Sequence, residues 1–504
     1  MNPTAGAGAP PTGPLVWGEA RARWVLTATV LGAALTFIDA TVVNLALPHL
    51  ARDLGAGSEA LTWVVNAYTL TLAALVLLGG ALGDRFGRRR VYVIGIVGFA
   101  VASAACGLAP DVGTLIAARA FQGVAAALLT PGSLALIQAT FTKTDRPRAI
   151  GAWSGLTGVA AAVGPFLGGW IIEVADWRWA FLINLPVAVV VVWITRRHVP
   201  ESRPPPTGDR LDWTGAGLLA LSLATLTFAL TAWSSAPFLS SRVAGGLVVS
   251  LLVGTVFGLW EHRSPAPLVP VRLFASRVFV VANLVTFLVY AALGVVFFSL
   301  GIVLQVGAAR SPIQAGLSLL PVTVIMLLFS SRAGALMGRV GARLPMTIGP
   351  LVAALGVALL TRVDAHVNYL TDVLLSTSVF GAGLTLMVTP LTATVLAAAP
   401  DEMVGLASGV NNAVARTGGL LAVAAVPLVG GLGGSGLTDP IQVVDGFETL
   451  MWSCVLLLVA GSVLAWIGVP AKRRHVVTAR PAEYHCSTAA PPMAAQTQPE
   501  AVPT

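Results

Sequence analysis

The sequence predicts an α-helical protein that crosses a membrane many times, and three observations lead to this fold class. Hydrophobic residues occupy 56% of the 504 positions and charged residues only 10%, whereas soluble proteins carry about 25% charged residues. The mean hydropathy is +0.84. Apolar runs of about 20 residues, the length that crosses a bilayer as a helix, recur from Trp24 to Val469. A water-soluble fold cannot bury that much apolar surface.

The distribution of charge and the spacing of the cysteines disfavour a nucleic-acid-binding protein, a disulfide framework and a zinc site. The net charge of +8 comes from short basic clusters between apolar runs, which orient a membrane protein rather than bind nucleic acid. The cysteines Cys106, Cys454 and Cys486 lack the spacing of a disulfide framework or a zinc site. Residues 1–20 do not resemble a cleaved signal peptide, so the first apolar run is expected to start insertion.

Apolar runs between charged or Pro/Gly-rich breaks predict fourteen spans in three groups. The first six are expected at 24–48, 60–83, 91–109, 112–138, 149–172 and 179–195. Two more follow a polar linker, at 213–233 and 243–260. The last six are expected at 279–305, 312–331, 346–363, 369–396, 404–430 and 447–469. We therefore expect an all-α membrane protein with two six-helix bundles and two extra central helices.

The same breaks divide the chain into five parts. They are a cytoplasmic N-terminal segment at 1–23, an N-terminal six-helix bundle at 24–195, a two-helix insertion with linkers at 196–278, a C-terminal six-helix bundle at 279–470 and a disordered cytoplasmic tail at 471–504. The tail is rich in Pro, Ala and Gln and has little to bury. Because arginines gather in alternate loops and aspartates in the others, both termini are expected in the cytoplasm.

An internal repeat relates the two groups of six. The residues Gly80-Ala81-Leu82-x-x-Arg85-x-Gly87-x-Arg89 reappear as Gly334-Ala335-Leu336-x-x-Arg339-x-Gly341-x-Arg343. At the same offset, Gly151-x-x-Ser154-Gly155 reappears as Gly405-x-x-Ser408-Gly409. Duplicated helix sets around a central site are typical of secondary transporters.

Five motifs, in order along the chain, resemble those of a known transporter family. They are Asp39-Ala40-Thr41-Val42-Val43-Asn44-Leu45-Ala46-Leu47-Pro48, Gly80-x-Leu82-x-Asp84-Arg85-x-Gly87-Arg88-Arg89, Arg119-x-x-Gln122-Gly123, Gly164-Pro165-x-x-Gly168-Gly169 and Trp177-Arg178-Trp179-x-Phe181-x-x-Asn184-x-Pro186. Together with the number of spans they cover most of the chain. The sequence resembles the fourteen-span branch of the drug:proton antiporters in the major facilitator superfamily.

This resemblance implies a major facilitator fold and proton-coupled export of amphipathic drugs or antibiotics, the activity behind multidrug efflux and antibiotic resistance. It implies alternating access between the two bundles, with a small amphipathic substrate and protons as the transported species. We expect no cofactor, no metal and a monomer in the bilayer. Some relatives that expel multiply charged cations carry an extra acid in the tenth span, and because 312–331 has none, dicationic compounds are less favoured substrates.

Asp39 and Arg119 are the candidate proton-coupling residues. Asp39 lies mid-run among apolar residues, where an ionised side chain costs roughly 2.5 to 3.5 kcal/mol on insertion scales and needs a proton or a partner. Arg119, mid-run in the fourth span, is the expected partner, and a carboxylate that depends on such a pair can couple proton flow to transport. The alternative is a permanent structural ion pair.

The loop after the second span is the candidate conformational switch. Its residues are Gly80, Asp84, Arg85, Gly87, Arg88 and Arg89. Glycines permit a tight connection, and Asp84 can bind an arginine or a helix N-terminus. A purely topological basic loop explains the arginines but not the acid. Gly338 replaces this acid in the second copy, so any charge latch is expected to be asymmetric.

The fifth span carries the candidate antiporter motif, with Gly164, Pro165, Gly168 and Gly169. Small residues let helices approach closely, and proline removes a backbone hydrogen bond and bends the helix. General helix packing explains any single glycine. The whole cluster is characteristic of antiporters in the family that the chain resembles, so it favours export over import.

Polar and aromatic side chains within apolar spans are the candidates for substrate binding. They are Gln122, Tyr68, Asn283, Tyr290, Asn411 and Asn412. A few placed polar groups can orient an amphipathic ligand, although each alone is more often structural. Arg416 in the thirteenth span either pairs with a substrate acid or binds a neighbouring carbonyl.

Other functions were weighed against a drug exporter. A dedicated exporter or uptake carrier for one endogenous metabolite or lipid stays open as the alternative. The scattered histidines disfavour an enzyme, and duplicated halves with a buried acid and arginine fit a channel less well. No phosphate-binding loop occurs, so ATP is not expected to drive transport. Since Lys143 and Lys472 are the only lysines, the composition indicates a G+C-rich bacterial source and thus a bacterial cytoplasmic membrane.

Overall fold

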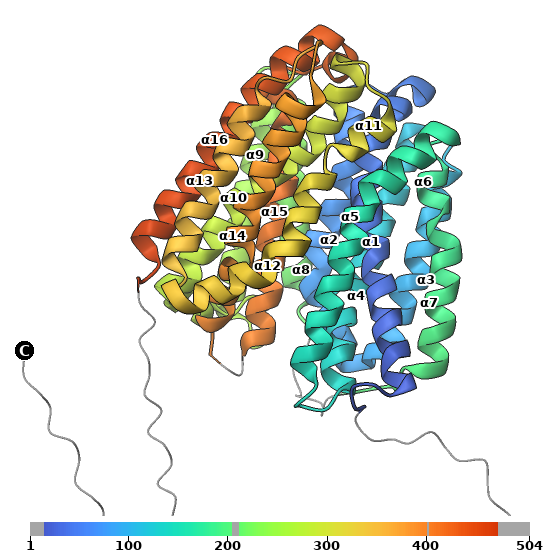
Figure 1. Ribbon diagram of the computed structural model, residues 1–504, viewed down its shortest axis with the longest axis vertical. Helices are drawn as coiled ribbons and strands as arrows, with labels where there is room; N and C mark the ends of the chain where they lie inside the picture. The colour runs from blue at the N-terminus through green and yellow to red at the C-terminus, as the bar shows by residue number, and fades with distance from the viewer. Residues whose placement is uncertain (1–14, 204–210, 401–402, 472–504) are drawn as a thin grey trace, which may run out of the picture.

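The computed structural model describes residues 15–203, 211–400 and 403–471 (Figure 1). These residues are almost entirely helical and contain no β-sheet beyond a single bridge between Leu15 and Phe141. Fourteen helical segments are long and apolar enough to cross a membrane. The predicted fold class and the predicted number of spans are therefore confirmed. Most of the predicted N-terminal segment and nearly all of the predicted tail lie outside the described residues.

The first six spans form the N-terminal bundle. Its helices are α1 (Ala20–Leu54), α2 (Ser58–Phe86), α3 (Arg88–Gly107), α4 (Val112–Thr140), α5 (Arg146–Val174), and α6 (Trp179–Leu182) with α7 (Asn184–His198) as one span. Asp111 caps α4 by accepting a hydrogen bond from the Thr114 N–H at 2.9 Å. The hydrogen bonds from Thr114 hold the pKa of the Asp111 carboxyl below its usual value.

The remaining spans form the insertion and the C-terminal bundle. The insertion is α8 (Trp213–Trp233) and α9 (Ser241–Arg263). The bundle holds α10 (Arg277–Ile302), α11 (Pro312–Leu317) with α12 (Leu320–Val340) as one span, α13 (Arg343–Leu360), α14 (Leu375–Ala397), α15 (Val404–Val429) and α16 (Pro440–Gly468). Two π-helical turns, Val303–Gly307 and Tyr369–Leu374, extend α10 and precede α14.

Several helices extend beyond the predicted apolar runs. The first run was predicted at 24–48, but α1 continues through Pro48 to Leu54, where Gly55 ends it with a φ of 62°. The tenth was predicted to end at 331, but α12 continues to Val340. Hydropathy marks only the hydrocarbon core, whereas helical hydrogen bonds continue through polar residues at the membrane surface.

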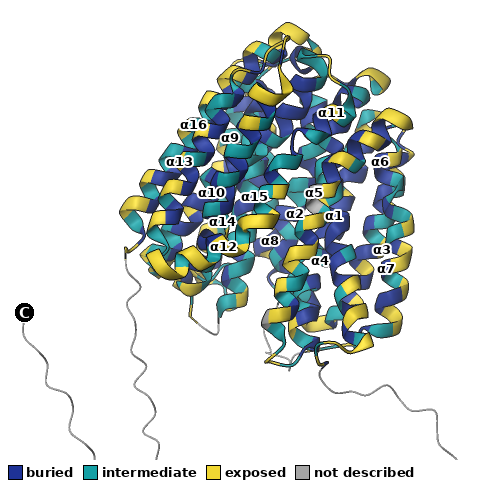
Figure 2. Cartoon of the chain, viewed as in Figure 1, coloured by how far each residue is buried: buried dark blue, intermediate teal, exposed yellow. Residues whose placement is uncertain are grey.

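The two bundles stand side by side (Figure 1), and the inserted helix α8 lies against both. Helix α8 packs on α2 of the N-terminal bundle and on α15 of the C-terminal bundle. Helix α9 pairs with α8 through Ser222 and Ser250, each hydroxyl donating to the other residue's carbonyl oxygen at 3.1 and 2.9 Å. Only 11% of the most apolar window of α9 is buried, so this helix mainly faces lipid. Figure 2 colours the described residues by burial.

The bundles contact each other tightly at one end of the molecule. We call the end with residues 84–90, 143–148 and 196–203 the basic-loop end, which is the lower end in Figure 1. At the opposite end, the Ser58 N–H donates to the Gly434 carbonyl at 2.9 Å and the Leu437 N–H to the Ser58 hydroxyl at 3.0 Å. The Ile313 N–H also donates to the Glu173 carboxylate at 3.2 Å.

Open space lies beside several helices at the basic-loop end. A methyl group placed on Gly151, Gly155 or Gly158 of α5 would meet no atom within 4 Å. The same is true of Gly338 on α12 and Gly405 on α15. Hydrogen bonds therefore join the bundles at the opposite end, whereas these glycines at the basic-loop end stand beside open space.

Candidate functional site

A buried ion pair joins α1 to α4 in the N-terminal bundle. Asp39 is 0% exposed and Arg119 is 1% exposed. The Asp39 Oδ2 lies 2.6 Å from a terminal nitrogen of Arg119. The structure thus brings together the two residues that the sequence singled out as an acid and a cation within apolar runs. Neither side chain has contact with water, so each depends on the other for its charge.

Gln122 closes this pair into a network. Its side-chain amide donates to the Asp39 Oδ1 at 2.9 Å, while its oxygen accepts from Arg119 at 2.6 Å. Arg119 and Gln122 are three residues apart on α4 and share one helix face. Both Asp39 oxygens accept a hydrogen bond, so the network fixes the position of the carboxylate and stabilises its charge.

A second layer of polar groups holds the network in place. The Ser103 hydroxyl on α3 accepts from Gln122 at 3.3 Å and from Asn184 at 3.0 Å, and it donates to the Phe181 carbonyl at 2.8 Å. The sequence interpretation missed Ser103. The sequence interpretation placed Asn184 in a motif but gave it no role. The only sequence signal for Ser103 was that it is a neutral polar residue within a span.

Arg119 has further partners on α2. Its Nε donates to the Val64 carbonyl at 3.1 Å, and its guanidinium lies 4.3 Å from the centre of the Tyr68 ring. The Phe181 ring centre is 5.8 Å away. Tyr68 is 2% exposed, yet its hydroxyl has no hydrogen-bond partner in the described structure. Tyr68, a candidate substrate contact, therefore packs its ring on the network, while its hydroxyl makes no hydrogen bond.

The predicted switch loop connects α2 to α3 at the basic-loop end. The Arg88 Nε binds the Asp84 carboxylate at 2.8 Å, and Gly87 turns the chain with a φ of 105°. The sequence interpretation missed Glu201, whose carboxylate accepts from the backbone N–H groups of Arg89 at 3.0 Å and Arg90 at 3.2 Å. Within the described ranges these partners all belong to the N-terminal half, so no link to the C-terminal bundle forms here.

The predicted antiporter motif lies where three helices meet. A side chain on Gly164 or Gly168 would collide with Thr41 or Val42, which follow Asp39 on α1. A side chain on Gly169 would collide with the carbonyl oxygen of Pro312 on α11. On the other side, the Pro165 carbonyl fills the space beside Gly316. Helix α5 thus contacts both the helix of Asp39 and the C-terminal bundle.

The other candidate substrate residues separate into two groups. The Asn411 amide donates to Asn283 at 3.2 Å and to Thr286 at 2.8 Å, so these polar groups join α15 to α10. No hydrogen bond is recorded for the side chains of Tyr290 and Asn412 in the described residues. Gln122 belongs to the Asp39 network. The structure does not gather the six candidates into one cluster.

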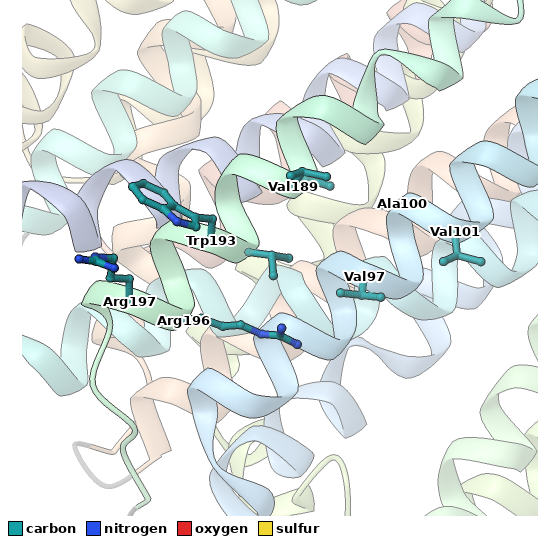
Figure 3. Close-up of a pocket in the computed structure, with 9 residues that line it drawn as sticks. Val97, Ala100, Val101, Val189, Trp193, Arg196 and Arg197 are labelled. Carbon is teal, nitrogen blue, oxygen red and sulfur yellow. The ribbon is translucent and has the colours of Figure 1, made fainter.

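A surface cavity lies away from this network. It has a volume of about 670 Å³ and lies between α3 and α7, lined by Val97, Ala100, Val101, Ala188, Val189, Val192, Trp193, Arg196 and Arg197 (Figure 3). Val101 and Val189 are strongly exposed, so it faces the surroundings of the bundle rather than the space between bundles. In the described part of the chain, no cluster of metal-ligating residues was found.

Comparison with known proteins identifies the family. Residues 29–423 match the family model described as Major Facilitator Superfamily. The chain belongs to the Major Facilitator Superfamily. Members of this superfamily are typically carriers rather than enzymes, and the chain is accordingly a multi-pass membrane protein.

Several similar proteins of this superfamily come from Streptomyces species. The puromycin resistance protein pur8 of Streptomyces alboniger is 36% identical over 89% of this chain and 92% of the relative. The methylenomycin A resistance protein of Streptomyces coelicolor is 34% identical over 80% and 85%. The tetracenomycin C resistance and export protein of Streptomyces glaucescens is 31% identical over 79% and 74%.

Solved transporter structures share the fold. A D-xylose–proton symporter is 17% identical with a TM-score of 0.63, covering 90% of this chain and 99% of that one. A POT family transporter in complex with 5-aminolevulinic acid is 13% identical with a TM-score of 0.67, covering 91% and 98%. At this identity the likeness shows the architecture and not the substrate.

Proposed function

We propose that this protein is a proton-driven exporter of amphipathic drugs or antibiotics that works by alternating access in the bacterial cytoplasmic membrane. Family membership supports transport, and the names of three relatives refer to antibiotic resistance or export. The motif Gly164, Pro165, Gly168 and Gly169 supports export over import. These relatives also favour a drug substrate over a single housekeeping metabolite.

The buried network around Asp39 is the observation that carries proton coupling. Asp39 is a fully buried acid within a span, and Arg119 and Gln122 occupy both of its oxygens. Protonation removes the negative charge that holds Arg119 and weakens the ion pair, and loss of the proton restores it. An acid whose protonation is tied to the position of a neighbouring helix can couple a proton gradient to a conformational change.

Helix α5 supplies the connection from this acid to the other bundle. Its glycines pack against Thr41 and Val42, immediately after Asp39, and against Pro312 of the C-terminal bundle. Movement of α1 on protonation of Asp39 therefore displaces α5 and the contact that seals the opposite end. Alternating access follows as a rocking of the bundles about this contact.

The sidedness of this proposal follows from charge. The basic-loop end faces the cytoplasm with both termini, because arginines remain on the cytoplasmic side. The present conformation is then open inward, where a drug enters before export. The switch loop formed by Gly80, Asp84, Arg85, Gly87, Arg88 and Arg89 is free of the C-terminal bundle here, and we propose that it binds that bundle when the cytoplasmic side closes.

Export of puromycin from energised cells tests the function. Cells that express the protein should accumulate less puromycin than cells without it, and a protonophore should abolish the difference. Asp39→Asn, which keeps the shape of the side chain, should abolish export at normal membrane expression. Asp111→Asn is the matched control, since Asp111 is an exposed acid at a helix cap.

The outcomes separate the parts of the proposal. Export that survives Asp39→Asn but not the protonophore would assign proton coupling to another group. Export that survives the protonophore would contradict a proton-driven mechanism altogether. If wild-type cells exclude no drug in a panel of antibiotics, a dedicated metabolite carrier becomes the better description.

A further inference from the structure

Arg416 is a membrane-embedded cation for which the structure provides no anion. It lies mid-way along α15 and is half-buried. Within the described ranges, no ion pair or hydrogen bond to its guanidinium is recorded. Asp39 forms its ion pair with Arg119 instead, and Gln122 binds its other oxygen. A charge at this depth is costly unless a partner or water supports it, and such residues mark substrate pathways.

The packing of α15 places Arg416 at the boundary between the bundles. Gly409 of α15 lies against the Leu77 side chain of α2. Leu420 packs in one cluster with Ala74 of α2. Arg416 lies between these two contacts along α15, so it sits beside the stretch of α2 that precedes Leu77.

Tyr68 of α2 and Tyr290 of α10 are the neighbouring polar groups. Tyr68 lies on α2 less than two turns before Ala74, which packs against α15, and Gly419, one turn after Arg416, lies against the Tyr290 backbone. The Tyr68 hydroxyl is buried without a partner, so it is free to donate a hydrogen bond to a group that binds beside it. Asn412 lies one turn before Arg416, on the same face of α15.

We propose that Arg416 and the Tyr68 hydroxyl form a subsite for an acidic oxygen group of the transported substrate, a carboxylate or a phenolate, with Asn412 and Tyr290 beside it. A guanidinium offers paired N–H donors that match such a group, and the Tyr68 O–H supplies a further donor. This inference rests on the proposed export function and adds a site for the acidic group of those amphipathic substrates that carry one, while substrates without such a group bind elsewhere in the transport path.

Tyr68 also connects this subsite to the proton site. Its ring lies 4.3 Å from the Arg119 guanidinium carbon, and Arg119 binds Asp39. A substrate that binds the Tyr68 hydroxyl acts on a ring that already stabilises Arg119. One side chain therefore touches both the substrate subsite and the proton-coupling pair, which gives the two a direct physical connection.

Binding of a matched dye pair tests the subsite. Rhodamine 110 carries a free carboxylic acid, and rhodamine 123 is its methyl ester with the same ring system. Fluorescence anisotropy with the purified full-length protein in nanodiscs should show tighter binding of the acid. Arg416→Gln should weaken binding of the acid by about tenfold or more, the value of a charge-assisted hydrogen bond, and leave the ester within about threefold. Tyr68→Phe should weaken the acid selectively by a smaller factor.

Arg332→Gln is the matched control, because Arg332 is an exposed arginine on α12 and should leave both dyes unaffected. Size-exclusion profiles show whether Arg416→Gln misfolds. If it does, Tyr68→Phe still tests the subsite, because this variant removes only one oxygen atom. Equal loss for acid and ester, no effect of either variant, or no binding of rhodamine 110 to the wild type would overturn the subsite. If only the subsite is wrong, the wild type still exports puromycin and a protonophore still abolishes that export. Puromycin export that a protonophore does not abolish would instead contradict the proposed proton-driven exporter.

Discussion

At the scale of single residues, the Asp39–Arg119 pair shows how a membrane protein carries charge in a dry interior. Each charged group interacts with the other in place of water. Gln122, Val64 and Tyr68 provide the remaining contacts of the Arg119 guanidinium. Such a pair contributes little net stability compared with an apolar replacement, but removal of one partner leaves an uncompensated charge. This asymmetry makes the pair a candidate switch.

Removal of Arg119 alone is expected to be more harmful than removal of both charges. Arg119→Gln should destabilise the protein by about 3 to 5 kcal/mol, since it strands the Asp39 carboxylate. The double variant Asp39→Asn with Arg119→Gln should recover part of that loss. Melting temperatures of the purified variants measure this, and strictly additive losses would show that the two residues do not act as a pair.

At the scale of helices, α5 uses the same small residue in two different ways. Gly164, Gly168 and Gly169 stand against α1 and α11 with no room for a side chain, while Gly151, Gly155 and Gly158 face open space. A glycine permits close packing at each of these positions. Only the part near the closed end shows it in this conformation.

Two alanine variants in α5 separate these uses. Gly169→Ala should impair folding or transport, because the new methyl group meets the Pro312 carbonyl oxygen and forces the bundles apart, with a cost of about 1 to 3 kcal/mol. Gly155→Ala should be tolerated, since nothing lies within 4 Å of the added group. Puromycin export at matched expression is the readout, and equal behaviour of the two variants would contradict the packing described.

The start of α3 depends on an acid from a distant part of the chain. Glu201 accepts from the N–H groups of Arg89 and Arg90, where a negative charge is favourable by about 0.3 to 1 kcal/mol. Glu201→Gln should speed hydrogen exchange at the first turn of α3. Glu448→Gln, an exposed acid on α16, serves as the control. Unchanged exchange in Glu201→Gln would mean that the loop is held by other contacts.

At the scale of the whole molecule, the two bundles meet at one end and part at the other. Cysteines placed at Gly155 and Gly405 should react with a water-soluble maleimide added from the cytoplasmic side, whereas a cysteine at Ala315 should not, since Ala315 is 0% exposed at the closed end. The buried Cys106 and Cys454 provide the unreactive background once Cys486 is replaced. The reverse labelling pattern would show that the protein rests in the other conformation.

The sequence predicted those parts of the molecule that depend on local pattern. Fourteen spans followed from run length, and Asp39 and Arg119 stood out because charges are rare within apolar runs. Glu201 was missed because an acid in a polar linker looks like any other, and its partners lie more than a hundred positions away. The pairing of Asn411 with Asn283 was equally invisible before α15 was packed on α10.

The closed network has an electrical consequence. Asp39 and Arg119 together carry no net charge, so the transmembrane voltage exerts little force on this part of the bundle while the pair is intact. A proton on Asp39 leaves Arg119 as a single positive charge, and each such charge responds to 100 mV with up to about 2.3 kcal/mol. The protein with a proton on Asp39 therefore responds to the membrane voltage more strongly than the protein without it. A step of the transport cycle that depends on voltage is accordingly one in which the Asp39–Arg119 pair is open.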